Sequence, residues 1–228
     1  VDIQAGVAVW NDKTGSYDLL TDPKLGSFYE DNKTFVGQDG PQTNSPNVSN
    51  TGFYIRKFIS EASGYTLRNY AENWWPWFRL GEIYLNAAEA AFELNDEPTA
   101  LPYINRLRQR AGFPANSLTS LTIEKIQNER RVELAFEDHR YFDMKRWRIA
   151  DITWNGNIDN DKAIVYGLYP YRIAGAKPGT QDQDKYIFVK TRSERFKVAR
   201  TFQQSNYYSF IADDVINNNP TIVKNPFQ

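Results

Sequence analysis

The stretch WPWFRLGEIYLNAAEAAFEL, at residues 75–94, decides the fold of this chain. Apolar side chains recur in it at steps of three and four residues, which places them on one face of a helix. Pro76 precedes the pattern, where a missing backbone donor costs little, and Asn95 follows it as a residue that tolerates the left-handed conformation of a helix end. The stretch predicts an amphipathic helix over residues 77–94, whose apolar face comprises Trp77, Leu80, Tyr84, Ala87, Ala88 and Ala91.

A second helix is expected over residues 98–111, after a short break. Pro102 is expected in its first turn, where proline is tolerated, and Gly112 provides the stop signal. Two helices with so short a link form a helical hairpin. The first helix also fits the opening W-x2-L-G-x2-Y of a tetratricopeptide repeat, but the second half of that repeat fits poorly and no second copy follows. The apolar face of the second helix is formed by Leu101, Ile104 and Leu107.

A third helix is predicted over residues 122–138, with Thr122 as its N-cap. Carboxylates such as Glu133 occupy positions on it where apolar residues are expected. The charge pattern alone favours a solvated helix with ion pairs between successive turns. The interleaved aromatic residues favour instead a paired, partly buried network, which must be satisfied to be tolerated. Both interpretations stay open here, and the network would comprise Arg79, Glu82, Glu129, Arg130, Glu133, Arg140, Asp143 and Arg146.

Three blocks carry a family resemblance: FRLGEIYLNAAEAAFEL at 78–94, INRLRQRAG at 104–112 and IQNERRVELAFEDHRYFDMKRW at 126–147. In this order they resemble the C-terminal part of SusD/RagB proteins, the nutrient-binding lipoproteins of outer-membrane glycan-uptake systems. TGFYIRKFI at 51–59 and the ending NNNPTIVKNPFQ match further blocks. The chain departs from the family pattern at Gly81, where Ala is usual, at Asp138, where Gly is usual, and at residues 210–212, which read Phe-Ile-Ala instead of Pro-Ile-Pro.

The helices and the resemblance together imply a mostly α fold with long loops and a few short strands, in which irregular segments cover the hairpin and the third helix. We expect a single domain over residues 1–228, with a loop and strand region at 1–72, a helical core at 73–150 and a loop and strand tail at 151–228. Family members are usually more than twice this long. The resemblance therefore implies that the N-terminal half of the family is absent here.

The resemblance also implies a function. It is the non-catalytic binding of a glycan or other nutrient at the outward-facing surface of a bacterial outer membrane, as the lipoprotein partner of a TonB-dependent transporter. The membrane would be reached only through a lipid anchor that is absent from this chain. The alternative is a helical-hairpin scaffold that contacts other proteins and takes no small-molecule ligand.

Composition narrows the remaining chemistry. The 27 Lys and Arg residues balance 28 Asp and Glu residues, which argues against nucleic acid as a partner, and the absence of Cys excludes disulfides and thiolate chemistry. The Asn- and Asp-rich run at 155–161 lacks the Gly and Glu of a calcium-binding loop, so we expect no metal. There is no phosphate-binding loop, and we expect no cofactor. His139 has no Ser or Cys motif beside it, and the glutamates of the third helix have Arg neighbours that lower a carboxyl pKa, so we expect no enzyme activity.

Ligand binding is the function that remains after these exclusions, and aromatic residues suit it because sugars stack their apolar faces on aromatic rings. Aromatic residues make up 15% of the chain. Those within the helices, including Trp77 and Phe136, are assigned to the core, whereas those in polar segments are the better ligand contacts. Short strands are expected at residues 5–10, 52–59, 163–173 and 186–192. The candidate ligand-binding residues are Trp10, Tyr17, Tyr29, Trp74 and Trp75.

Overall fold

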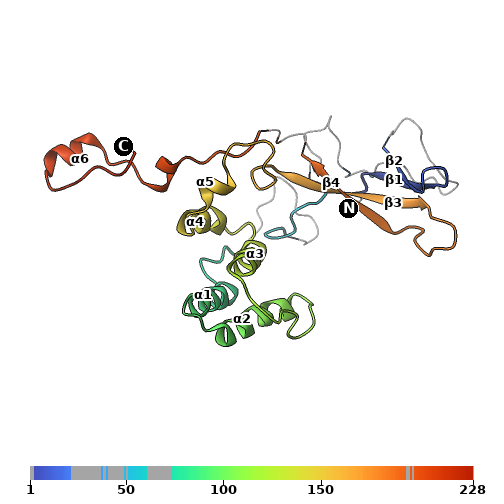
Figure 1. Ribbon diagram of the computed structural model, residues 1–228, viewed down its shortest axis with the longest axis horizontal. Coiled ribbons are helices and arrows are strands. Elements are labelled where there is room, and N and C mark those ends of the chain that lie inside the picture. Colours follow the sequence, from blue (N-terminus) through green and yellow to red (C-terminus); the bar gives the residue numbers. More distant parts are fainter. Residues whose placement is uncertain are drawn as a thin grey trace. The chain divides into compact units, whose positions relative to one another are not determined.

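The computed structural model describes residues 3–21, 37, 40, 49, 51–60, 73–193, 196 and 198–227. Contacts group the chain into two compact units, Val1–Ile55 with Ile149–Gln228, and Arg56–Arg148. The second unit is helical and the first contains the sheet (Figure 1). Within the described residues, none of the helices has the length and apolar composition needed to cross a bilayer. The organisation as one domain stays a prediction.

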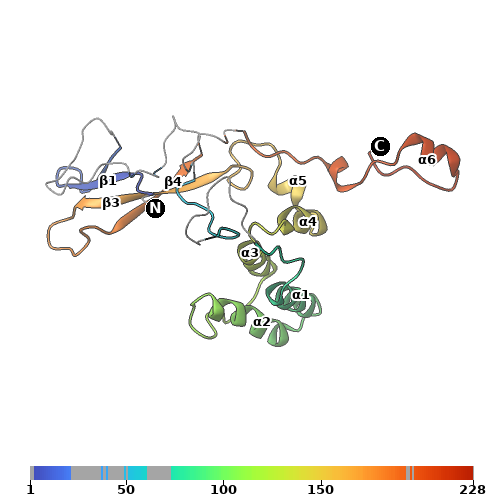
Figure 2. The ribbon, with the colours of Figure 1, turned by 180° about the vertical axis from the view of Figure 1, so that it is seen from behind.

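The helical unit is built on the predicted hairpin. Helices α1 (Leu80–Glu93) and α2 (Glu97–Arg110) pack side by side (Figures 1 and 2). Asn95 turns the chain between them with a φ of 60°, and the Asp96 side chain caps α2 by accepting a hydrogen bond from the Thr99 backbone N–H at 3.2 Å. Their facing sides, with the following helix, form a core of Leu85, Ala88, Ala100, Ile104, Leu107, Leu121, Ile126 and Leu134.

The first helix begins later than its sequence pattern predicts, and of the predicted apolar face only Tyr84, Ala88 and Ala91 pack in or against the core. Arg79 is extended, with a φ of −145°, so that α1 starts only at Leu80. Trp77 is 82% exposed and Leu80 is 61% exposed, and their assignment to the buried face was wrong. The buried residues are Gly81, Leu85 and Ala88, mostly small side chains that allow the neighbouring helices to approach closely.

The position of Pro102 was also wrongly predicted. It lies inside α2, not in the first turn, because the helix already begins at Glu97. Proline has no backbone N–H, so the helical bond from residue 102 to the carbonyl of residue 98 is missing. The helix nevertheless continues, since Ile104 and Leu107 beyond the proline are buried in the core.

The predicted third helix is two helices. Helix α3 (Ile123–Glu133) begins after Thr122, whose hydroxyl accepts a hydrogen bond from the Lys125 N–H at 3.3 Å. It ends before residue 138, and α4 (His139–Arg146) follows. Phe136 and Asp138 have φ values of 64° and 61°, a backbone conformation that no continuous right-handed helix contains. Phe136 is 58% exposed in this link, so its assignment to the core was wrong as well.

The other unit contains a four-stranded sheet in the order β2-β1-β3-β4. Strand β1 (Gly6–Asn11) pairs antiparallel with β2 (Ser16–Leu20) and parallel with β3 (Tyr166–Gly175), which pairs antiparallel with β4 (Tyr186–Arg192). The strands expected at 5–10, 163–173 and 186–192 are confirmed, whereas β2 was not predicted. One face of the sheet carries the core residues Ala5, Ala8, Tyr171 and Ile173.

The strand expected at residues 52–59 does not form: residues 51–60, all of them described, contain no strand. Gly52 has a φ of 85° and lies against the carbonyl of Leu168, where a Cβ atom would come within 1.9 Å of the oxygen. Phe58 also has a positive φ, of 63°. Both conformations are incompatible with an extended strand.

Three short helices follow α4 and belong to the sheet-containing unit. They are α5 (Ala150–Thr153), a 3-10 helix, η2 (Gln204–Tyr207), and α6 (Asp213–Asn218). The Tyr207 hydroxyl accepts a hydrogen bond from the Ala150 N–H at 2.9 Å and donates one to Asp151 at 2.6 Å. The whole is a mostly helical fold with a few short strands, as predicted from the sequence, although a tetratricopeptide-like detail is not established.

Candidate functional site

An aromatic segment precedes α1 in the helical unit. Trp74 is 92% exposed, and Trp75 is 45% exposed and packs against Phe58 with ring centroids 5.0 Å apart. Trp77 and Phe78 are exposed in the same segment. Sequence reasoning missed these last two because it extended the helix across them. Their neighbour Pro76 was the available signal in the sequence.

A second aromatic pair lies in the sheet-containing unit. Trp10 and Tyr17 are directly opposite each other on β1 and β2, with centroids 5.2 Å apart in an edge-to-face arrangement. The Lys177 ammonium lies 4.9 Å from the centre of the Trp10 ring, and the indole N–H donates to Asp12 at 2.9 Å. Both rings are half-buried and held in place. Tyr29, the fifth candidate, lies outside the described residues.

The predicted charged network is centred on a buried ion pair between α3 and α4. Arg130 donates from Nε to both oxygens of Asp143 at 2.8 Å, and from Nη1 to Asn86 of α1 at 2.7 Å. Glu82 of α1 lies 3.7 Å from Arg130 and 3.7 Å from His139 Nε2. Two helices, α1 and α4, thus direct polar groups at the buried guanidinium of α3.

A second cluster holds the carboxyl end of α3. Arg79 donates to Glu133 Oε1 at 2.5 Å, to the Glu133 carbonyl at 2.6 Å and to Glu137 at 2.8 Å. Lys57 donates to the carbonyls of Glu133 and Ala135 and contacts Glu137 at 2.5 Å. Burial disfavours the ionised form of Glu137, but hydrogen bonds from Arg79 and Lys57 outweigh it, so the pKa of this carboxyl lies below its usual value. Two cations therefore cap the exposed carbonyls of the helix end.

The third cluster joins α4 to α1. Arg146 contacts Glu89 at 2.5 Å and Asp143 at 3.2 Å, and the Trp147 indole donates to Glu89 at 2.8 Å. Burial raises the pKa of the Glu89 carboxyl, but hydrogen bonds from Arg146 and Trp147 outweigh that effect and lower it.

The remaining network residues lie at the edges of these clusters. Glu129 is paired with Arg108 of α2, and Glu133 also contacts Arg110 at 2.8 Å. Arg140 is half-buried on α4 and lines the pocket described below. Sequence reasoning did not include five network members, although all of them lie in blocks that carry the family resemblance: Lys57, Glu89, Arg108, Arg110 and Glu137.

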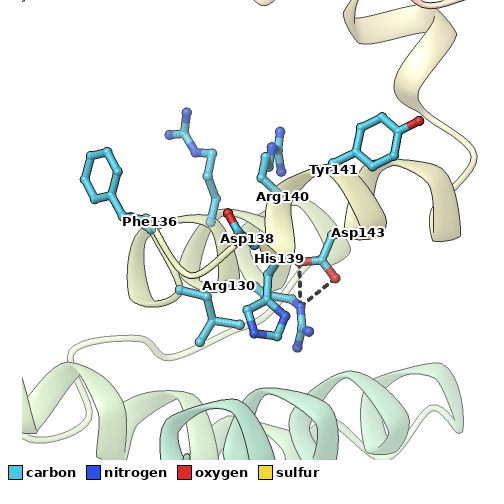
Figure 3. A pocket seen from close by; sticks show the side chains of 10 residues that line it. Arg130, Phe136, Asp138, His139, Arg140, Tyr141 and Asp143 are labelled. Atoms are coloured by element: carbon cyan, nitrogen blue, oxygen red, sulfur yellow. Dashed lines mark hydrogen bonds and ion pairs between the residues drawn. The ribbon is translucent and has the colours of Figure 1, made fainter. Parts of the chain in front are cut away.

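A pocket of about 270 Å³ lies at the link between α3 and α4. Its lining includes the aromatic rings of Phe136 and Tyr141, which flank it with Arg140 between them (Figure 3). The Arg140 and Arg130 guanidinium groups point to opposite sides of the ribbon (Figure 3). The pocket therefore combines apolar walls with a basic group that is separate from the buried Arg130–Asp143 pair.

No group of three or more His, Cys, Asp or Glu side chains suited to a metal is found in the described parts of the chain. Glu89 and Glu137 of the helical unit are held by guanidinium and ammonium groups, which favours their ionised form. Such an arrangement stabilises helix packing and leaves exposed aromatic rings and the small pocket as the surfaces able to contact a ligand.

The helical hairpin, the paired α3 and α4 and the sheet define a SusD-like fold. A solved SusD-like protein of Bacteroides fragilis matches it with a TM-score of 0.53 and 24% identity, over 99% of this chain and 37% of that one. The sequence model of the SusD family matches residues 8–227, and the chain belongs to this family.

Curated relatives carry the same family name. SusD-like protein P2 of Formosa agariphila is 34% identical over 117 residues, covering 46% of this chain and 23% of that protein. A SusD-like protein of Bacteroides ovatus is 27% identical over 172 residues, covering 64% of this chain and 29% of that protein. The chain thus spans less than a third of the length of these relatives.

Proposed function

We propose that this chain is part of a non-catalytic glycan- or nutrient-binding protein of the bacterial outer-membrane surface, where it is the lipoprotein partner of a TonB-dependent transporter. The observation that carries the proposal is the match of the SusD family over residues 8–227. Binding without catalysis agrees with the chemistry of the helical unit, since Glu89 and Glu137 there are paired with cations.

The argument against catalysis rests on the carboxylates. A glycosidase needs one carboxyl group that holds a proton near neutral pH beside another that is ionised. In the helical unit the pKa values of Glu89 and Glu137 are both lowered by their basic partners. Neither group is suited to act as a general acid.

The segment before α1 is the proposed place for sugar contact. Trp74 presents almost its whole surface, and Trp75 is fixed against Phe58, so one ring is available and its neighbour is held. Exposed aromatic rings on a rigid support are typical of recognition sites. Trp10 and Tyr17 offer a smaller, half-buried edge in the other unit.

Isothermal titration with a panel of neutral oligosaccharides tests the proposal. We expect weak binding to at least one member, and a loss of about tenfold or more when Trp74 and Trp75 are both replaced by Ala, because stacked rings contribute on the order of 1 kcal/mol each. The matched control is Phe210→Ala, which removes a ring that is 75% exposed in a different unit.

The results of this titration separate sugar binding from the protein-interaction scaffold. Unchanged binding by the Trp74 and Trp75 double variant would remove this segment from the site. A folded wild-type chain that binds no member of the panel would contradict sugar binding and favour the protein-interaction scaffold. Co-purification of the membrane-anchored protein with a TonB-dependent transporter tests the partnership separately.

A further inference from the structure

The pocket between α3 and α4 is lined by the Arg131 guanidinium, which makes no ion pair within the charged network. Arg130 points to the side of the ribbon opposite Arg140 (Figure 3) and is fully engaged by Asp143 and Asn86. Arg131, the next residue, is exposed and donates to the Asn128 side chain at 2.8 Å. No carboxylate of the described residues lies within ion-pair distance of Arg131.

This arrangement differs from that of most other arginines of the helical unit. Arg79, Arg108, Arg110 and Arg146 each contact a glutamate. Arg131 makes no such contact although it lies on the same helix as Glu133 and lines a cavity. A guanidinium with free donor capacity beside a cavity is suited to bind a carboxylate or sulfate, whose oxygens match its planar set of N–H groups.

Groups near Arg131 also favour an anion in the pocket, with the exception of Asp138. Arg140 projects between Phe136 and Tyr141 (Figure 3), and α4 begins at the pocket, so its dipole favours negative charge there. Asp138 opposes an anion, since its exposed carboxylate also lines the pocket. The Arg131 guanidinium and the N-terminus of α4 therefore stand against this one carboxylate.

We propose that this pocket binds the anionic substituent of a small acidic sugar, a carboxylate or a sulfate ester, with Arg131 as its donor and Phe136 or Tyr141 against the sugar ring. A volume of about 270 Å³ is just below the usual range for ligand pockets, about 300–1,000 Å³, and suits one sugar unit better than a long chain. The proposal rests on the proposed function only in the choice of a sugar as carrier of the charge.

Titration followed by NMR chemical shifts tests the site with four probes: glucuronate, glucose 6-sulfate, glucose and inorganic sulfate. We expect shifts at residues 131–141 with the two acidic sugars and none with glucose. Arg131→Ala should weaken acidic-sugar binding about tenfold, in line with the loss of one charge-assisted contact. Asp138→Asn should strengthen it severalfold, because it removes the opposing charge and keeps a residue type that tolerates positive φ.

The matched control is Lys125→Ala, which removes one half-buried cation from the same helix outside the pocket lining. It should leave binding unchanged, and thermal melting of each variant verifies folding. Equal binding of inorganic sulfate and glucose 6-sulfate would support the anion site and refute the ring contact. Binding of glucose as tight as that of glucuronate, or wild-type affinity in Arg131→Ala, would overturn the proposal. The proposed function is tested by neutral oligosaccharides and by replacement of Trp74 and Trp75, whereas this proposal is tested by acidic sugars and Arg131→Ala. The two proposals can therefore fail independently.

Discussion

Arg130 on α3 and Asp143 on α4 form a bidentate ion pair across the break between the two helices, with both distances at 2.8 Å and both residues at most 5% exposed. The pair replaces the continuous backbone hydrogen bonding that a single helix would have supplied. It therefore fixes the angle at which α4 leaves α3.

Arg130→Met should be strongly destabilising, because it leaves the Asp143 carboxylate buried without its principal partner. Removing one member of a buried pair costs about 3–5 kcal/mol in the free energy of unfolding. Urea denaturation followed by circular dichroism measures the change. The double variant Arg130→Met with Asp143→Leu should be more stable than Arg130→Met alone, since no unpaired charge remains.

The control for this pair is an exposed one. Lys224 and Asp213 are 3.1 Å apart with side chains 54% and 70% exposed. Asp213→Asn should change the free energy of unfolding by less than about 1 kcal/mol. If Arg130→Met were as mild as Asp213→Asn, the network would not be important for stability.

Lys57→Met should loosen the end of α3. The Lys57 ammonium donates hydrogen bonds to two carbonyls there. Losing these bonds should lower the free energy of unfolding by about 1–3 kcal/mol. Hydrogen exchange should accelerate in residues 133–138 before the rest of the helical unit. Lys125→Met, which alters a half-buried lysine in the first turn of α3, should leave exchange at residues 133–138 unchanged. Equal effects of both variants would contradict the capping role.

Acid should destabilise the helical unit through Glu89 and Glu137. The pKa of each carboxyl is lowered in the folded chain, so the unfolded chain binds protons first as the pH falls. Their contribution to stability is complete above the unfolded value of about 4.3 and is lost as the pH falls through the folded values. The free energy of unfolding, measured between neutral pH and pH 3, should therefore decline less steeply in the double variant Glu89→Gln with Glu137→Gln than in wild type. An identical slope would show that Glu89 and Glu137 do not cause the acid destabilisation.

Asp138→Gly should be neutral or stabilising. The residue has a φ of 61°, where a side chain is strained and glycine is not. Asp138→Val should instead destabilise the chain by about 1–2 kcal/mol or more, because a β-branched residue fits this conformation poorly. Thermal melting of both variants checks the prediction. A melting temperature for Asp138→Val at or above that of Asp138→Gly would show that residue 138 does not have a positive φ.

Part of this structure follows from local sequence alone. The spacing of Leu85, Ala88, Ile104 and Leu107 favours two packed helices, and the break at Asn95 makes them neighbours. The family blocks correctly place the fold among SusD-like proteins. Strands β3 and β4 are recognisable as runs rich in apolar and aromatic residues on either side of the polar loop at 175–185.

Other features depend on contacts that no local pattern reveals. The start of α1 is displaced because Arg79 binds Glu133 and Glu137, residues more than fifty positions away. The break after α3 is visible only as a departure, since Asp138 stands where the family has Gly. Of the site candidates, the structure places Trp74 and Trp75 together and pairs Trp10 with Tyr17, but periodicity could not have shown that Trp77 is exposed.

The parallel pairing of Gly6 with Tyr171 joins segments about 165 residues apart, and the helical unit lies wholly between them. Closing so long a loop costs about 3 kcal/mol more entropy than closing the β1–β2 hairpin. The two hairpins and the helices can therefore form early, while β1 and β3 meet late. Until they meet, each presents an open strand edge, and at that stage another copy of the chain can compete for the same backbone hydrogen bonds.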